Sequence, residues 1–408
     1  MHAAIQRQPD LMAQFEDPAA TASKREHGGL IALGSGMRPR RVAAAALLLC
    51  VSASACSKAT ADSTDIAPSS GRHSDRRAEA LSRARLWEPV PVERMDVRAG
   101  PDDPRSFPFL STVDCRYQDR ALRGHSLKFA CELAGGDSVK VKVGGSNGEV
   151  FAEVAASRLL WALGFGADHM YPVRVVCRGC PTRFGGRHTP SGDVFDAAVI
   201  ERPLEGAVFP GDEGWGWWEL DSVNPQHGGA SQAERDALAL IAAFLQHTDN
   251  KTEQQRLLCL GEPPPRPAAQ CARPLLMLND VGLTFGAANF LNDNGMGSAN
   301  FRAWSAEPIW KDPERCTANL RPSFSGSLSN PRLSEAGRQF LADLLMRLSD
   351  RQITDLFEVS RIAERRREIA VLTESEPPAT ALASGTPTAE WVRVFKQKRD
   401  AIATNRCR

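Results

Sequence analysis

The sequence lacks a charge of one sign, a long apolar run and the short motifs of several enzyme classes. Its 408 residues hold 50 Lys and Arg against 49 Asp and Glu, a formal net charge of +1. A chain that binds nucleic acid through bulk charge is usually strongly basic, so this balance argues against that class. His-Glu-x-x-His and Walker A motifs are absent from the sequence. A zinc protease of the first type or a P-loop protein therefore has no motif support.

The apolar run near the N-terminus, residues 42–51, is too short to span a bilayer. It follows the basic segment that starts at Met37 and precedes Ser-Ala-Ser-Ala-Cys, which ends at Cys56. A basic segment, an apolar segment and small residues in this order indicate an export signal over 37–55. The small residues before Cys56 resemble a bacterial lipoprotein signal, although Ala53 occupies the usual aliphatic position, so plain secretion is the alternative.

We therefore expect an exported protein of the cell envelope or periplasm. The resemblance implies that a lipid on Cys56 is its only attachment to the membrane. Residues 1–36 show no helical period and are interpreted as a mis-called upstream segment.

The cysteine count supports export. Ten cysteines are many for a cytosolic chain of this length. Eight remain beyond the signal and the predicted anchor: Cys115, Cys131, Cys177, Cys180, Cys259, Cys271, Cys316 and Cys407. An even number in an oxidising compartment predicts up to four disulfides. Two alternatives stay open, namely buried free thiols and a zinc site formed by the Cys177-Arg-Gly-Cys180 segment with His169 and His188.

The order of apolar patterns predicts an α+β fold with a polar tether over 56–105. Short alternating segments predict strands at 127–133, 138–143, 173–177 and 195–200, and residues 149–163 have a helical period. Strands with a single helix make residues 106–205 a small β-rich lobe.

Residues 206–370 are expected to be mainly helical. Ser231 and Glu234 form a capping-box pattern that starts a helix running into His247. A strand pair at 256–260 and 275–278 follows, and a disulfide between Cys259 and Cys271 would close it. The last predicted elements are helices at 334–348 and 350–366, and a linker with a terminal helix over 371–408.

Four motifs occur in a suggestive order. They are a strand with Lys140 and Lys142, a helix with Glu153, the segment 247–254, and Asn279-Asp280-Val-Gly after a strand. This is the order of the protein-kinase motifs. Residues 125–365 resemble the protein-kinase-like fold, and look closest to divergent branches such as the secretory-pathway and HipA-type kinases. The resemblance implies two lobes, with ATP and Mg²⁺, or Mn²⁺ instead, bound between them.

Phosphoryl transfer depends on positioning and electrostatics, which gives each residue type a role. Lys142 is the first choice and Lys140 the second for the cation on the phosphates. Glu153 is preferred to Glu149 as the partner of that lysine.

The resemblance implies further roles. Asp249 would orient or deprotonate the acceptor hydroxyl, and Lys251 would neutralise transferred charge. Asp280 and Gln254 would hold the metal, with Gly282 allowing a sharp turn after Asp280.

Two departures from the kinase pattern are evident. Gln254 replaces the usual metal-binding Asn, so its reach differs. A Gly-rich loop is missing, and Gly135-Gly136 would be its shortened substitute. On the nucleotide side, Gly144 follows the lysine strand and Glu201 would lie at the hinge whose backbone pairs with adenine.

The sequence thus predicts an exported, monomeric, atypical kinase acting on an unknown protein or small-molecule hydroxyl, with no nucleic-acid partner. Two alternatives are a pseudokinase that serves as an envelope binding or scaffold lipoprotein, and a structural disulfide-rich envelope protein. The Trp215-Gly-Trp-Trp218 segment is expected to pack between lobes rather than to bind a ligand.

Overall fold

The computed structural model describes residues 69–124, 126–209, 214–261, 271–286, 297–322, 326–365 and 386–408. All of them belong to one compact unit, Ile66–Arg408. The predicted upstream segment, the signal peptide and Cys56 lie outside the described residues.

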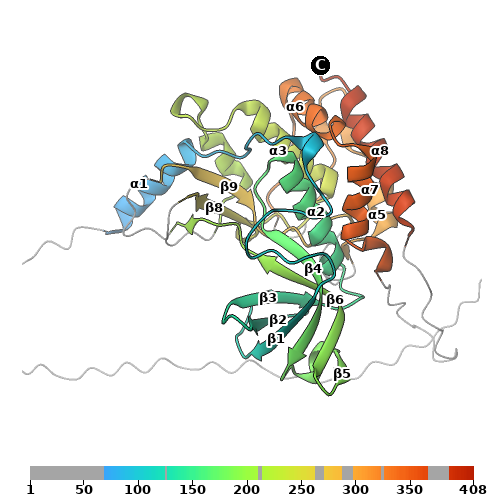
Figure 1. Cartoon of the computed structure of the whole chain (residues 1–408). Coiled ribbons are helices and arrows are strands. Elements are labelled where there is room, and N and C mark those ends of the chain that lie inside the picture. Colours follow the sequence, from blue (N-terminus) through green and yellow to red (C-terminus); the bar gives the residue numbers. More distant parts are fainter. Residues whose placement is uncertain are drawn as a thin grey trace, which may run out of the picture. The chain divides into compact units, whose positions relative to one another are not determined.

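A six-stranded sheet forms the first part of the unit (Figure 1). Its strands are β1 Thr112–Gln118, β2 Lys128–Leu133, β3 Ser138–Val143, β4 His169–Arg178, β5 Arg187–Thr189 and β6 Gly192–Arg202. Their order is β3-β2-β1-β4-β6-β5, and β3 also pairs with β6. Five strands therefore close into a ring, in which only β1 and β4 run parallel.

The alternation in β3 explains how its lysines come to face away from the ring. Val139, Val141 and Val143 join the apolar cluster of the sheet, with Phe129 and Tyr171 as large members. Because successive side chains point to opposite faces, Lys140 and Lys142 lie on the other face. The predicted β2–β3 hairpin is confirmed, with Gly136 at a φ of 80° in its turn.

Helix α2, Glu149–Leu163, confirms the helix predicted from the sequence. Nearly all of its side chains are buried, including Glu153 and Arg158. It packs on β4 and on helix α7, Asp350–Val359, and lies between the sheet and the other helices in Figure 1. Gly164 ends it in a left-handed conformation, the usual helix stop.

Most of the remaining described elements contribute to the larger apolar core. The helices are α1 Ser69–Ser82, α3 Gln232–Leu245, α5 Phe301–Ala306, α6 Glu335–Met346 and α8 Thr388–Thr404. The strands are β7 Ala207–Val208, β8 Gln255–Cys259, β9 Pro274–Leu278, β10 Trp310–Asp312 and β11 Thr317–Ala318. Short 3-10 helices are η1 Val92–Arg94, η2 Thr182–Phe184, η3 Trp217–Ser222, η4 Pro225–His227, η5 Thr252–Gln254 and η6 Ile362–Glu364.

Several local predictions for this second part are confirmed. The capping box of Ser231 and Glu234 starts α3, and β8 pairs antiparallel with β9. Helices form close to each place predicted after residue 330. Trp215 is fully buried against Trp217, so the expected packing role of this segment is confirmed for these two residues.

The structure differs from the predicted tether. Leu86, Val92 and Val97 are buried in the same core as α2 and α3. These apolar residues are spaced irregularly, without a helical or strand period, which is why the pattern did not reveal them. Within the described residues the folded part thus begins well before residue 106.

Four cysteine pairs lie at disulfide distance: Cys115–Cys131, Cys177–Cys180, Cys259–Cys271 and Cys316–Cys407. The hairpin disulfide expected between β8 and β9 is among them. Cys177 and Cys180 bond to each other, which leaves no thiolates for the zinc alternative. Several disulfides suggest an oxidising location outside the cytoplasm. None of the helices in the described ranges is both long and apolar enough to cross a membrane.

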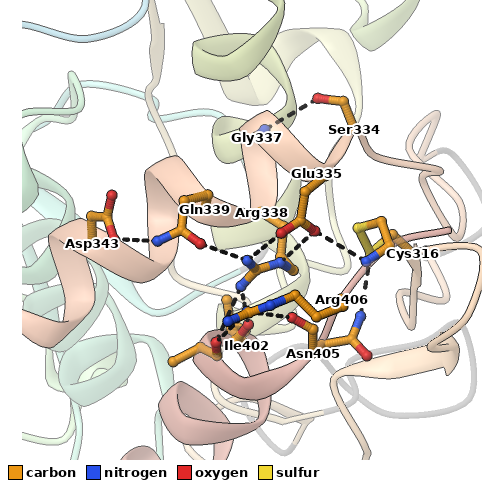
Figure 2. Close-up of polar contacts among 12 residues, drawn as sticks. Cys316, Ser334, Glu335, Gly337, Arg338, Gln339, Asp343, Ile402, Asn405 and Arg406 are labelled. Atoms are coloured by element: carbon orange, nitrogen blue, oxygen red, sulfur yellow. Dashed lines mark hydrogen bonds and ion pairs between the residues drawn. A yellow bond between two sulfur atoms is a disulfide. The ribbon is translucent and has the colours of Figure 1, made fainter.

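Helix α8 is attached to α6 by a buried polar network (Figure 2). Arg338 is fully buried and donates to Ile402 O at 2.7 Å, to both carboxylate oxygens of Glu335 and to Gln339 Oε1. The backbone N–H of Cys407 donates to Glu335 as well. We call Glu335, Arg338, Gln339, Ile402 and the Cys316–Cys407 disulfide the arginine cluster.

Candidate functional site

Lys142 is the centre of the site. Its side chain is 1% exposed, and its Nζ lies 2.7 Å from Glu153 Oε2, 3.1 Å from Glu149 Oε2 and 3.6 Å from Asp280 Oδ1. The predicted pairing of Lys142 with Glu153 is therefore present in the structure. Glu149, the second choice, contacts the lysine too, because residues four apart lie on one face of α2. We call these four residues the lysine cluster.

In the lysine cluster, burial and the neighbouring charges have opposite effects on the pKa of each group. Burial alone would lower the pKa of Lys142, but Asp280, Glu153 and Glu149 outweigh it and raise that pKa well above its ordinary value. Burial raises the pKa of Glu153 to about 8, against the opposing effect of Lys142. The Asp280 pKa is lowered against the effect of partial burial, because Lys142 and Lys140 face it. The ammonium group is thus charged and is held by Asp280, Glu153 and Glu149.

The segment after α3 is fixed by buried hydrogen bonds. Helix α3 ends at Leu245, and Gln246 turns the chain with a φ of 55° before His247. Asn250 donates to His247 O at 3.0 Å and accepts from the Leu328 N–H at 2.8 Å. These bonds hold the backbone on both sides of Asp249.

Asp249 lies beside two of the other predicted site residues. Gln254 Nε2 donates to Asp249 Oδ2 at 2.8 Å, and Lys251 Nζ lies 3.2 Å from the same oxygen. The N–H of Asp280 donates to Gln254 O, and Asp280 follows directly on β9 as predicted. The Asp249 and Asp280 segments are therefore joined through Gln254.

Gly282 lies where the segment after β9 passes close to helix α2. It has no positive φ, unlike the turn glycines of the described residues. A Cβ at this position would lie 3.0 Å from Glu149 Cγ. The glycine lets the chain after Asp280 pass against α2, whereas the sequence prediction was a sharp turn.

One polar cavity collects these groups. Its lining consists of Gly124, Ser126, Lys128, Glu149, Asp249, Lys251, Gln254, Asp280 and Leu283. Asp249, Lys251, Gln254 and Asp280 were all predicted as site residues. Lys142 and Glu153 lie behind the wall that Glu149 and Asp280 form.

Other predicted site residues lie outside this cavity. Gly144 borders a separate cavity together with Phe151, Phe184 and Phe195. Lys140 makes an ion pair with Glu201 across the β3–β6 pairing, on the same sheet face as Lys142. Neither lysine of β3 reaches the polar cavity surface directly.

The sequence analysis missed the turn between β1 and β2. Gly124 and Ser126 of this turn line the cavity, whereas Gly135 and Gly136 of the next turn do not. Lys128 was missed as well, although it lies opposite Lys142 in the β2–β3 hairpin. Counting back from Lys142 across the hairpin would have placed Lys128 on the same face.

The donors around the cavity suit a hard divalent cation. Asp280 offers a carboxylate, and Gln254 keeps its Oε1 as an acceptor while its Nε2 binds Asp249. A cation of the Mg²⁺ type prefers such oxygens and takes further ligands from water and phosphate. Within the described ranges, the closest His, Cys, Asp and Glu groupings lie elsewhere, at Cys115, Cys131 and Cys177 and at Cys316, Glu335 and Cys407. The cavity thus offers oxygen ligands from a few side chains and is not a closed metal cage.

Two histidines of the described residues, His188 and His247, take no part in such a site. His188 is exposed and lies 3.0 Å from Asp193. His247 is fully buried, and burial lowers its pKa to about 4, so it is neutral at pH 7. The lining of the polar cavity includes neither.

Comparison with known proteins gives little further guidance. No protein-family model and no curated protein matches the sequence. Among solved structures, the Helicobacter pylori proinflammatory kinase CtkA aligns with 11% identity and a TM-score of 0.40. The alignment covers 72% of this chain and 97% of that chain. Such a likeness is weak, so the case for function depends on the geometry of the site.

Proposed function

We propose that this chain is an atypical kinase that binds ATP with Mg²⁺ and transfers the terminal phosphoryl group to a hydroxyl acceptor. The observation that carries the proposal is the lysine cluster beside Asp249. A lysine on a strand is bonded to a glutamate of the next helix, and both lie against Asp280. In protein kinases this ion pair and the metal-holding aspartate must both be in place.

The residues around the cavity have complementary roles in this chemistry. Lys142 lies behind the cavity wall, and its charge would hold Glu149 and Asp280 in position and act on the phosphates through that wall. Asp280 and Gln254 would hold Mg²⁺, or Mn²⁺ instead, and the bound ion would neutralise phosphate charge. Asp249 would accept the proton of the acceptor hydroxyl, with Lys251 3.2 Å away to offset the transferred charge.

The two walls of the cavity support a two-lobed arrangement. One wall comes from the sheet, through Gly124, Ser126 and Lys128. The other comes from the segments after α3 and β9, which belong to the mainly helical part. In this proposal the nucleotide lies between the walls. The expected adenine pairing at Glu201 is not part of it, because Glu201 lies within β6, between Lys140 of β3 and Met170 of β4.

The compartment of the proposed reaction follows from the disulfides and the N-terminal pattern. We propose a monomer anchored in the cell envelope by a lipid on Cys56, acting on a protein or small molecule found there. An envelope is expected to hold little ATP, which makes the pseudokinase scaffold the rival proposal.

The test is transfer of label from γ-labelled ATP by the purified, disulfide-intact chain, with envelope extract as the acceptor source. Replacing Asp249 by Asn should lower the rate about 10²- to 10⁴-fold, because general-base help is lost. Asp221→Asn, at an exposed position, is the matched control and should transfer as the parent does. Mg²⁺-dependent ATP binding without transfer to any acceptor would instead favour the scaffold.

A further inference from the structure

Lys128 differs from the other lysines near the cavity because it has no acidic partner. It is the first residue of β2, and its Nζ donates to Ser126 Oγ at 3.2 Å. Lys142 contacts three carboxylates, and Lys251 pairs with Asp249. Among the residues that the structure describes, no carboxylate lies within ion-pair distance of Lys128. Its charge is therefore available to an anion in the cavity.

The turn before β2 is shaped around this amine. A Cβ added to Gly124 would lie 2.6 Å from Lys128 Nζ, and Gly124 has a φ of +88°. Any other residue would both strain the backbone and push the amine away. The turn thus lets the lysine lie across Gly124, at the cavity that both residues line.

Lys128 and Lys142 occupy the same face of the hairpin. They are direct partners in the β2–β3 register, so their side chains leave the sheet side by side. Burial lowers the pKa of Lys128, and the charge of Lys142 lowers it further, while Glu149 and Asp280 oppose both effects. An anion in the cavity would relieve the repulsion between the two ammonium groups.

We infer that Lys128 binds the phosphate chain of the nucleotide from the β1–β2 side of the cavity, across from Asp280. The inference deepens the proposed function and depends on it. The ammonium group would donate to a non-bridging phosphate oxygen, while Asp280 and Gln254 hold the cation on the other side. Lys128 would then distinguish nucleotides by their phosphates, and would contribute nothing to recognition of the base.

The experiment is a binding titration of the full disulfide-intact chain with Mg²⁺–ATP, and with adenosine by competition. Lys128→Met should weaken Mg²⁺–ATP binding about 10- to 100-fold, the usual range for a lost charge-assisted hydrogen bond, and leave adenosine unchanged. Lys128→Arg keeps the charge and should retain most of the affinity. The matched control is Arg123→Met, which removes a positive charge from an exposed position of the same turn and should bind as the parent does.

The outcomes separate this inference from the proposed function. Unchanged Mg²⁺–ATP affinity in Lys128→Met, with a binding parent chain, overturns the inference and leaves the function standing. Equal losses for ATP and adenosine also overturn it, because they indicate general damage to the site. A parent chain that binds no nucleotide contradicts the proposed function and this role together. Should Lys128→Met fail to fold, Lys128→Gln, which keeps a neutral donor, undergoes the same titration.

Discussion

The lysine cluster and the arginine cluster are both networks around one buried cation, yet their donors and acceptors are matched differently. Arg338 places its guanidinium N–H groups on Glu335, Gln339 and the backbone oxygen of Ile402. Lys142 has three ammonium hydrogens and faces three carboxylates, of which Glu149 and Asp280 also line a cavity. In the first network, protein acceptors take up the donors of the cation, whereas the second network borders a cavity.

The difference separates a structural role from a functional one. A network in which protein acceptors take up the donors rigidifies the chain and joins α6 to α8. A network that borders a cavity with an excess of acid costs stability and is retained where a ligand or reaction uses the charges. The experiments below are chosen to break one network and observe the other.

The largest stability effect is expected from the Cys316–Cys407 disulfide of the arginine cluster. It closes a loop with a sequence separation of 91, whereas Cys177–Cys180 has a separation of 3. Loop entropy gives about 4.5 kcal/mol for the first and about 1.6 kcal/mol for the second. Urea unfolding of the two double Cys→Ala variants measures the difference, and equal losses would contradict the entropic argument.

The next effect concerns Lys142→Met. Removing the cation leaves Glu149 and Glu153 buried without their ion-pair partner and takes from Asp280 its main cation, which should cost about 3–5 kcal/mol at pH 7 and abolish nucleotide binding. Carboxylates without the lysine have folded-state pKa values above their unfolded values. Their cost therefore falls as the pH drops and they become protonated. Unfolding at pH 7 and pH 4 checks this, and a variant that is equally destabilised at both pH values would show that the acids are not the cause.

Arg338→Met should affect stability alone. It leaves the Ile402 oxygen without its buried donor, at a cost of about 1–3 kcal/mol, while Glu335 remains partly in solvent. Nucleotide affinity should equal that of the parent chain at a temperature where both are folded. A loss of nucleotide affinity in Arg338→Met would mean that the two clusters are coupled, which would contradict a purely structural role for the arginine cluster.

The smallest effect is a pH dependence from His247. Burial lowers its pKa to about 4 from the ordinary 6.5, and within the described residues neither ring nitrogen has a hydrogen-bond partner. The folded state therefore binds fewer protons there than the unfolded state between these values, and stability is lost as the pH falls from 6.5 to 4. His247→Phe should show a shallower loss over this range in urea unfolding. Parallel pH profiles for the two proteins would rule out a buried neutral histidine.

Local patterns predicted much of the fold and part of the site. The period of β3 placed Lys140 and Lys142 on one face of the strand, and the helix over α2 offered both Glu149 and Glu153. The Ser231 capping box and the strand before Asn279 marked the elements that lead to Asp249 and Asp280. These are features of neighbouring residues in the chain, and such features can be read from the sequence.

The buried residues and close contacts that the sequence could not reveal depend on packing between segments far apart in the chain. Leu86 and Val92 have no periodic neighbours, so their burial with α2 and α3 was not predictable. Gly124 lines the cavity only because the β1–β2 turn folds over it, while Gly135 lies on the other hairpin turn. Gly282 is needed for its contact with Glu149 on a distant helix. Each of these depends on which elements meet, which spacing alone does not encode.

The most direct test of the lysine cluster is thermal unfolding of the disulfide-intact chain with and without ATP and Mg²⁺, beside Asp280→Asn. A ligand at about 100 times its dissociation constant adds roughly 2.7 kcal/mol, which should raise the midpoint by a few degrees. We expect a Mg²⁺-dependent rise in the parent chain and none in Asp280→Asn. An equal midpoint with and without nucleotide in the parent chain would contradict the account of the lysine cluster as a nucleotide site.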